Sequence, residues 1–520
     1  MPLEHALPLS ELPAGSKKAV KVGETEILLV HTEEGTLHAV EAKCPHAGGP
    51  LEQGAMCNGR LICPWHTGTF ELATGALVEP PPLRSLKHYE VQVEGDAILV
   101  DPTPVNAPSL AHYDDNALRQ PTDATTEHHH MMTIGGGAAA TAAICTLRQN
   151  GFAGRITMID PVTSEPVDRT NLSKMTLAGQ KPVEPLWNQE EKNKLRVERL
   201  VTRVEHLDGD AGTLRTSDGL IHRFDAALLA PGGIPRRLGI PGEHLPHVHT
   251  IRHAQDMDKI AATMGEDPKG KQVVLIGDSF IAFEAASALT IRGLKATVVS
   301  RSPEPFSKQF GEAAQAILSL HRANGVTLQA GAEAREITAE AVMLHSGESL
   351  PAALVVVAVG VRVATDFQHG LPTEDDGGIL VDETLKAAAK LWVAGDAASV
   401  NGTRIEHWRV AEQHGRTAAF GMLHRPGEHD TQGRETYGGV PFFWTFHFGK
   451  RFGYVGHASQ WDDLQVDGSL GDTNFLAYYV KDHVVKAVFS CGRDSETAML
   501  AESMREPLTL EQARKAAASM

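Results

Sequence analysis

Two short cysteine–histidine pairs are the residues of this sequence with the most specific chemistry. One residue separates Cys44 from His46, and after sixteen further residues come Cys63 and His66, with two residues between them. Two thiolates can hold one iron of a [2Fe-2S] cluster while two neutral imidazoles hold the other, which raises the reduction potential of the cluster. A zinc site is the alternative, but zinc fingers usually pair like residues at other spacings. The pattern favours a redox cluster and a role in electron transfer.

Short strands and turns surround these pairs over residues 1–102. Glycine and proline flank both pairs, which is typical of tight loops that bring backbone N–H groups close to a cluster. We therefore predict an all-β Rieske [2Fe-2S] domain over residues 1–102. Residues 103–130 are rich in Pro, Asp, Asn, Thr and His and lack periodicity, which indicates a linker. The histidine run 128–130 could bind a metal, but a solvated linker end is the favoured interpretation.

Composition narrows the class of protein. The chain has 520 residues, enough for three or four domains. Its five cysteines are too few for a disulfide framework, which suits a reducing compartment. The net charge of −17 disfavours nucleic acid as a partner, and no apolar run approaches membrane-spanning length. The first residues lack the features of a secretory or transit peptide, so we expect a cytoplasmic protein.

A first dinucleotide-binding motif follows the linker. The apolar strand 131–134 leads into Gly135, Gly137 and Ala140, which open a helix. In this pattern the first glycine permits a tight turn, the second lets a pyrophosphate approach the backbone, and the alanine allows close packing of helix on strand. A second strand ends in Asp160, which is placed to accept a hydrogen bond from a ribose hydroxyl. Strand, helix, strand and acid in this order make the motif specific.

A second, altered motif begins after the strand 271–276. It has Gly277, Ser279 and Ala282 at the three motif positions, so a serine replaces the second glycine and narrows the approach for a pyrophosphate. A structural fold without nucleotide stays open as an alternative. The next strand ends in Ser300 and Arg301, where an NAD site normally carries an acid. An arginine there can accommodate a 2′-phosphate, so we expect NADPH to be tolerated alongside NADH.

Three later glycine turns complete the pattern. They are Gly232-Gly233, Gly360 within Val-Gly-Val, and Gly395-Asp396 at the end of a strand, where an acid could accept from a ribityl hydroxyl. Each alone could be an ordinary turn, but their order makes that interpretation weak.

Disulfide reductases carry a cysteine pair after the first acidic strand end, and residues 161–179 contain no cysteine. The electrons are therefore not expected to reach a dithiol.

The motifs at residues 167–174, 277–281, 378–382, 395–396 and 406–413 carry a family resemblance. Residues 131–520 resemble a flavoprotein of the apoptosis-inducing-factor and ferredoxin-reductase type, and the whole chain resembles the Rieske-containing apoptosis-inducing-factor-like oxidoreductases. The resemblance implies an all-β Rieske domain, two Rossmann-like α/β dinucleotide-binding domains and a C-terminal α+β domain. The implied limits are 131–249 and 368–432 for the FAD-binding domain, 250–367 for the NAD(P)-binding domain and 433–520 for the C-terminal interface domain.

The resemblance also implies site residues and cofactors. The cofactors are FAD, NAD(P)H and the [2Fe-2S] cluster. Lys174 and Glu284 are implied to form an ion pair beside the flavin ring, where the lysine would favour the reduced flavin; a surface cation is the alternative for Lys174. Trp444 is implied to lie near the flavin, with plain core packing as the alternative. The residues implied to line the FAD site are Asp160, Arg169, Lys174, Val204, Asp396, Glu406, His407 and Trp408.

The function that these features predict is electron transfer within one chain. NAD(P)H would reduce FAD, FAD would reduce the fused Rieske cluster, and an acceptor, for example an oxygenase, would take the electrons. The loop tips at His46 and His66 should then face the flavin side, with Trp444 and Phe446 as the expected docking surface. An oxidase or quinone reductase whose flavin reacts directly, and a redox-sensing module, remain alternatives. The sequence leaves open the terminal acceptor and whether the chain forms a homo-oligomer.

Overall fold

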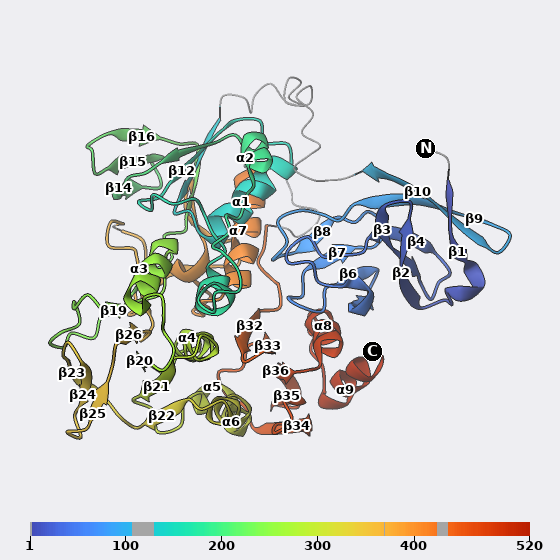
Figure 1. Ribbon diagram of the computed structural model, residues 1–520. Helices are drawn as coiled ribbons and strands as arrows, with labels where there is room; N and C mark the ends of the chain where they lie inside the picture. Colours follow the sequence, from blue (N-terminus) through green and yellow to red (C-terminus); the bar gives the residue numbers. More distant parts are fainter. Residues whose placement is uncertain (1–2, 107–128, 369, 424–434) are drawn as a thin grey trace.

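The computed structural model of the chain describes residues 3–106, 129–368, 370–423 and 435–520. It contains an N-terminal β module, two α/β domains and a β-rich C-terminal domain (Figure 1). This arrangement confirms the fold class expected from the sequence. Among the described residues, no helix is both long and apolar enough to cross a lipid bilayer.

The N-terminal β module consists of two antiparallel sheets. The larger sheet has the order β1-β10-β9-β4-β3-β2, and the smaller one has the order β5-β6-β7-β8. Its strands are β1 (Glu4–Pro8), β2 (Ser16–Val22), β3 (Thr25–His31), β4 (Leu37–Glu41), β5 (Ala55–Cys57), β6 (Arg60–Ile62), β7 (Thr69–Glu71), β8 (Leu77–Glu79), β9 (His88–Glu94) and β10 (Ala97–Asn106). Alternating apolar residues such as Leu28, Val40 and Phe70 form a buried core that includes both predicted cysteine ligands.

The first α/β domain is built on a six-stranded sheet with the order β13-β12-β11-β17-β30-β29, in which only β29 is antiparallel to its neighbour. Helices α1 and α7 pack on each other beside the sheet (Figure 1). The elements are β11 (His130–Ile134), α1 (Ala138–Gln149), β12 (Arg155–Ile159), α2 (Gln189–Leu195), β13 (Val197–Leu200), β17 (Ala226–Leu229), β29 (Lys386–Ala388), β30 (Leu391–Val393) and α7 (Trp408–Leu423). Smaller sheets are formed by β14 (Val204–Asp208), β15 (Thr213–Thr216) and β16 (Ile221–Arg223), by β18 (Gly233–Pro235) and β27 (Val361–Val363), and by β28 (Ile379–Val381) and β31 (Ala398–Val400).

The second α/β domain repeats the parallel architecture with a five-stranded sheet of order β19-β26-β20-β21-β22. Apolar residues fill its strands because helices cover the parallel sheet. Its elements are β19 (Val248–His249), α3 (Ala254–Met264), β20 (Gln272–Ile276), α4 (Phe280–Ile291), β21 (Lys295–Ser300), α5 (Ser307–Phe310), α6 (Gln315–Ala323), β22 (Thr327–Ala330) and β26 (Leu354–Val357), with a side sheet of β23 (Ala334–Ile337), β24 (Ala341–Leu344) and β25 (Ser349–Pro351).

The C-terminal domain joins the other parts. Its antiparallel sheet has the order β32-β33-β36-β35-β34, and α8 packs against β5 of the N-terminal module. Figure 1 shows α8, in red, directly beside the blue N-terminal module. The elements are β32 (Phe442–His447), β33 (Lys450–Gly456), β34 (Asp463–Ser469), β35 (Asn474–Lys481), β36 (Val484–Cys491), α8 (Asp494–Ser503) and α9 (Leu510–Ala518).

The strand ends differ slightly from the predicted domain limits. Strand β10 continues past residue 102 to Asn106, and β11 begins at His130, so both flanks of the predicted linker are extended backbone. Strand β19 lies just before residue 250 and nevertheless pairs within the sheet of the second α/β domain. Residues 107–128 of the predicted linker, including the first histidine of the 128–130 run, lie outside the described residues.

Candidate functional site

The two cysteine–histidine pairs lie in two similar loops, one after β4 and one after β6. In the first loop the Cys44 N–H donates to the Gly49 carbonyl at 2.9 Å, and in the second the Cys63 N–H donates to the Gly68 carbonyl at 2.8 Å. The loops lie so close together that a Cβ atom on Gly49 would come within 2.9 Å of the Cys63 sulfur. The chain therefore needs glycine at that position to bring the two loops together.

The four side chains form two pairs of like ligands. The thiols of Cys44 and Cys63 share a hydrogen bond and are almost fully buried, whereas Nδ1 of His46 lies 3.1 Å from Nδ1 of His66. In the described part of the chain, no three His, Cys, Asp or Glu side chains converge on a point that could hold one metal ion. A thiol pair beside an imidazole pair matches the mixed ligands of a two-iron cluster, in which each iron takes one pair.

The imidazoles of both histidines are held in the form that can bind iron. Burial lowers the pKa of His46 and lowers that of His66 well below its ordinary value. A neutral imidazole has a free lone pair for a metal, whereas a protonated one has none. The loops are therefore prepared for a [2Fe-2S] cluster in both geometry and protonation.

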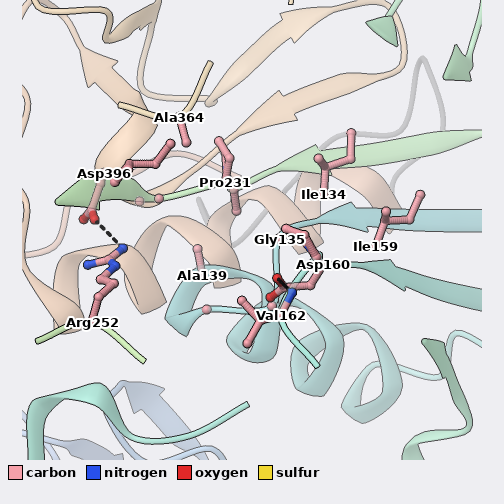
Figure 2. Close-up of a pocket in the computed structure, with 18 of the residues that line it drawn as sticks. Ile134, Gly135, Ala139, Ile159, Asp160, Val162, Pro231, Arg252, Ala364 and Asp396 are labelled. Carbon is pink, nitrogen blue, oxygen red and sulfur yellow. Dashed lines mark hydrogen bonds and ion pairs between the residues drawn. The ribbon is translucent and has the colours of Figure 1, made fainter. Parts of the chain in front are cut away.

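A cavity of about 870 Å³ lies at the carboxyl ends of β11 and β12. Gly135 turns the chain there with φ of +110°, and a Cβ atom at this position would lie 2.1 Å from the Ala230 carbonyl oxygen. A Cβ atom on Gly137 would meet no atom within 4 Å, so this position opens directly into the cavity. Figure 2 shows Asp160 at the end of its strand, close to Gly135, with its carboxylate accepting from the Val162 N–H at 2.9 Å.

Most residues that the sequence predicts for the FAD site line this cavity. They are Gly135, Gly137, Asp160, Arg169, Val204, Gly395, Asp396, Glu406 and Trp408. Ala140 is fully buried in α1, as its predicted packing role requires. His407 is different, because it packs against the Phe443 ring at 4.4 Å and is not among the residues that line the cavity.

Two arginines, Arg169 and Arg252, bring cationic donors to the cavity. Burial and the charge of Arg252 lower the pKa of Arg169 to about 10, with Asp160 and Asp396 acting in the opposite direction. Arg252 lies 3.6 Å from Asp396 (Figure 2), and its buried Nε has no hydrogen-bond partner. Two cations that repel each other beside an unpaired donor suit a pyrophosphate, so the cavity fits FAD. Arg252 was not predicted to line this cavity, because it lies in the segment 250–367 expected to bind the nicotinamide nucleotide.

The predicted ion pair between Lys174 and Glu284 is present and buried. Lys174 Nζ lies 3.1 Å from Glu284 Oε1 and donates to the Thr170 carbonyl at 2.7 Å, and the two side chains are 9% and 4% exposed. Glu284 also accepts hydrogen bonds from the hydroxyls of Ser173 and Thr445 at 2.5 and 2.6 Å. These contacts show that Lys174 is not a solvated surface cation.

A second cavity, of about 370 Å³, lies between the cysteine–histidine loops and the flavoprotein part. Lys174, Trp408 and Phe446 line it together with His46 and His66. The Trp444 ring lies 4.2 Å from the His66 ring and 6.1 Å from the His46 ring, measured between centroids. The loop tips therefore contact Trp444, while their orientation toward the flavin ring stays a prediction.

The residues predicted to bind the nicotinamide nucleotide lie apart from both cavities. Gly277, Ser279 and Ala282 form the turn into α4, and Gly360 follows β26. The Ser279 hydroxyl donates to the Ala358 carbonyl at 2.8 Å and accepts from the Ala282 N–H at 3.3 Å. The Arg301 side chain is 74% exposed and lies 3.6 Å from Glu333.

An ionic joint that the sequence analysis did not find holds the N-terminal module against α7 and α8. Glu79 lies 3.6 Å from Arg409, and it accepts from Arg505 at 2.5 Å and from Gln413 at 2.7 Å. Burial alone would raise the pKa of Glu79, but the two arginines hold that pKa below its ordinary value. Arg409 stood in a recognised motif, yet no sequence signal linked it to Glu79, because more than three hundred residues separate them.

Comparison with known proteins agrees with these sites. A family model described as "Pyridine nucleotide-disulphide oxidoreductase" matches residues 129–415, and one described as "Rieske [2Fe-2S] domain" matches residues 5–90. These matches define an NAD(P)H-dependent oxidoreductase with FAD, NAD(P)H and a [2Fe-2S] cluster as cofactors. The first match covers more than half of the chain, and the chain belongs to the pyridine nucleotide-disulphide oxidoreductase family, with a Rieske domain fused at its N-terminal side.

Individual relatives match either nearly the whole chain or a part of it. The chain is 30% identical over 514 residues to apoptosis-inducing factor 3 of Homo sapiens, covering 95% of this chain and 82% of that protein. It is 30% identical to the ferredoxin–NAD(+) reductase component of the p-cumate 2,3-dioxygenase system of Pseudomonas putida, covering 52% and 68%. The solved covalent putidaredoxin reductase–putidaredoxin complex shares the fold, with a TM-score of 0.67, 22% identity, and 75% and 98% coverage.

Proposed function

We propose that this chain conducts electrons internally from NAD(P)H to its own Rieske centre and from there to an acceptor. When bound, FAD takes two electrons from the nicotinamide and passes them on singly, which a [2Fe-2S] centre can accept one at a time. The observation that carries the proposal is that Trp408 lines both cavities while the tips of the Rieske loops rest on Trp444. The two sites are therefore separated by little more than the Trp408 side chain and the second cavity.

The proposed roles of the residues follow from their places. Gly137, Arg169 and Arg252 would hold the pyrophosphate of FAD, and Asp160 would accept from a ribose hydroxyl. Lys174, fixed by Glu284, would keep a positive charge beside the flavin ring and so favour its reduced form. In the second α/β domain, the turn at Gly277 and Ser279, together with Gly360 and Arg301, would bind the nicotinamide nucleotide.

The proposed acceptor is an oxygenase component or a similar one-electron protein. Support comes from the name of the relative that serves a dioxygenase system. The proposed compartment is the cytoplasm, where the five cysteines, all of them free thiols in the structure, would remain reduced.

Anaerobic mixing of the full-length holoprotein with NADH, without any acceptor, tests the internal path. Cluster reduction, followed by its visible absorption and its electron paramagnetic resonance signal, should proceed at a rate that does not depend on protein concentration. The Cys63→Ala variant should lack the cluster and still show flavin bleaching. Flavin bleaching in the wild type with a cluster that stays oxidised would refute the proposal and would favour a flavin that reacts directly with its acceptor.

A further inference from the structure

A buried chain of side chains extends away from the Lys174–Glu284 pair. The Thr445 hydroxyl lies 2.6 Å from Glu284 Oε1 and 2.9 Å from His447 Nε2, and His447 Nδ1 lies 3.2 Å from His321 Nε2. Glu284, Thr445, His447 and His321 are all at most 4% exposed. The four side chains come from α4, β32 and α6, so only the tertiary fold brings them together.

The position of each hydrogen along this chain follows from counting donors and acceptors. Glu284 faces the Lys174 ammonium and acts as a carboxylate, which can only accept, so the single O–H of Thr445 is used on Glu284. The Thr445 oxygen must then accept from Nε2 of His447. Burial lowers the pKa of His447 well below its ordinary value, with His321 and Lys174 adding to the shift. The imidazole of His447 is therefore neutral, with its one hydrogen on Nε2.

The same count of donors and acceptors extends to His321, the last side chain in this hydrogen-bonded series. Because Nδ1 of His447 has no hydrogen, it accepts from Nε2 of His321. Burial lowers the pKa of His321 to about 3, so this ring is neutral too and its Nδ1 is bare. That Nδ1 is buried without a hydrogen-bond partner, and the rings of Phe283 and Phe448 lie 5.0 Å from the His321 ring. The hydrogen-bonded series thus ends in an unpaired lone pair on His321 Nδ1, which costs less free energy than a buried N–H without an acceptor.

We propose that His321 and His447 are positioning residues that act on Glu284 through Thr445. His321 selects the Nε2–H tautomer of His447, and that tautomer turns the Thr445 hydroxyl toward Glu284. The hydroxyl then offsets part of the negative charge that Glu284 places beside Lys174. This inference rests on the proposed function, because Lys174 matters for electron transfer only if it faces the flavin. Two histidines that do not touch Lys174 or Glu284 would thereby tune the charge beside the flavin.

The competing arrangement is the opposite tautomer of His447. The backbone carbonyl of Phe283 lies close enough to the His447 ring to raise its pKa, against the effect of burial, and it is the other acceptor available to this ring. With the hydrogen on Nδ1, His447 would have a bare Nε2, which would attract the Thr445 hydroxyl. Glu284 would then lose one of its donors. The two arrangements predict different hydrogen positions on the same nitrogen atoms.

Nitrogen-15 NMR of the full-length holoprotein, labelled at histidine, distinguishes the two arrangements. We expect His447 and His321 of the wild type each to carry hydrogen on Nε2 and a bare Nδ1. In His321→Phe the donor to His447 is lost, and a measurable fraction of His447 should change to the Nδ1–H tautomer. His321→Gln, whose amide can still donate, should keep the wild-type tautomer. Hydrogen on Nδ1 of His447 in the wild type would overturn the proposal.

The midpoint potential of the bound flavin provides the second readout. Loss of one donor from Glu284 lets the carboxylate neutralise Lys174 more fully, so the reduced flavin in His321→Phe should be disfavoured about threefold to tenfold. A tenfold change corresponds to a decrease of about 30 mV for two electrons. The His249→Phe variant is the matched control, because His249 bonds Thr263 at 2.7 Å in a similar pair away from Glu284. It should leave the potential and the His447 tautomer unchanged.

The outcomes separate this inference from the proposed function. A changed tautomer in His321→Phe with an unchanged flavin potential, or no change in either, would overturn the positioning role. NADH-driven reduction of the cluster in the same preparations would still support the internal electron path. Conversely, a wild-type protein with the expected tautomers and a lowered potential in His321→Phe would support the positioning role even if its cluster stayed oxidised.

Discussion

The two α/β domains share one architecture but differ at the glycine turn that leads from a strand into a helix. In the first domain Gly137 opens into the cavity, and α1 begins without a side-chain cap, so its first N–H groups remain available. In the second domain the hydroxyl of Ser279 already caps α4. The first site is walled by arginines drawn from two domains, whereas Arg301 of the second is mostly exposed. The difference fits a cofactor that stays bound in the first domain and a substrate that must leave the second.

The largest expected effects come from replacing the first glycine of each dinucleotide-binding motif by alanine, one motif at a time. Gly135→Ala places a Cβ atom 2.1 Å from the Ala230 carbonyl oxygen, and Gly277→Ala places one 2.2 Å from that of Ala358. Since φ is positive at both positions, the strain is on the order of a few kcal/mol. Gly135→Ala should be purified without FAD. Gly277→Ala should retain FAD and lose reduction by NADH. Absorption at the flavin band and the rate of bleaching measure both, and equal FAD loss in the two variants would break the comparison.

The next effect concerns the contact between the Rieske domain and α7 of the first α/β domain. Glu79→Gln leaves the buried Arg409 without its counter-charge, while Arg505 keeps Glu502, and the loss should cost about 3–5 kcal/mol. Denaturant unfolding measures this loss. Cluster reduction by NADH should slow while flavin reduction does not, because the joint contacts α7 and α8 rather than the second α/β domain. Equal slowing of both steps would contradict this division.

The same joint has a defined pH dependence. The pKa of Glu79 is lowered in the folded protein, so its contribution to stability is present in full above the ordinary value of 4.5. It is lost as the pH falls through the lowered folded-state value. Wild-type stability should therefore decrease more steeply below about pH 4.5 than that of Glu79→Gln, as measured by denaturant unfolding across this range. Parallel pH profiles would show that Glu79 does not carry the effect.

A smaller effect tests whether the second domain helps to hold FAD. Arg252 enters the first cavity although it belongs to the segment that leads into α3. Arg252→Ala should weaken FAD binding about tenfold to a hundredfold, since a charged donor to the pyrophosphate is lost. Titration of the apoprotein with FAD measures the change. Arg301→Ala is the control and should bind FAD like the wild type.

The smallest expected effect is on the choice of nicotinamide. Arg301→Ala should lower the ratio of kcat/KM for NADPH to that for NADH about threefold to tenfold, because an exposed arginine contributes modestly to binding a 2′-phosphate. Glu333 beside it competes for the same guanidinium, which limits the effect. Steady-state kinetics with both nucleotides decides the matter. A strong NADH preference that the substitution does not alter would exclude Arg301 from the nucleotide site.

The strands and helices that carry the site could be predicted closely from the sequence. The strand predicted at 131–134 is β11, which begins one residue earlier, and the strand predicted at 271–276 is β20, which begins one residue later. Such elements follow from local apolar patterns and glycine turns, which a short stretch of sequence contains in full. The environment of His407 was less predictable. It is next to Trp408 in the same motif, but neighbouring side chains at the start of a helix point in different directions. Of these two residues, only Trp408 lines the cavities.

The sequence alone determined the chemistry of this protein: mixed ligands for a cluster, two nucleotide folds, and the lysine and glutamate that pair beside one of them. Those features depend on residue types at short spacings or on motifs that many proteins share. Only the tertiary structure decided that Arg252 lines the first cavity, that Glu79 ties the Rieske domain to α7, and that Thr445 links Glu284 to two buried histidines. These contacts join residues far apart in the chain, and burial selects them through the balance of desolvation and pairing, which no local pattern records.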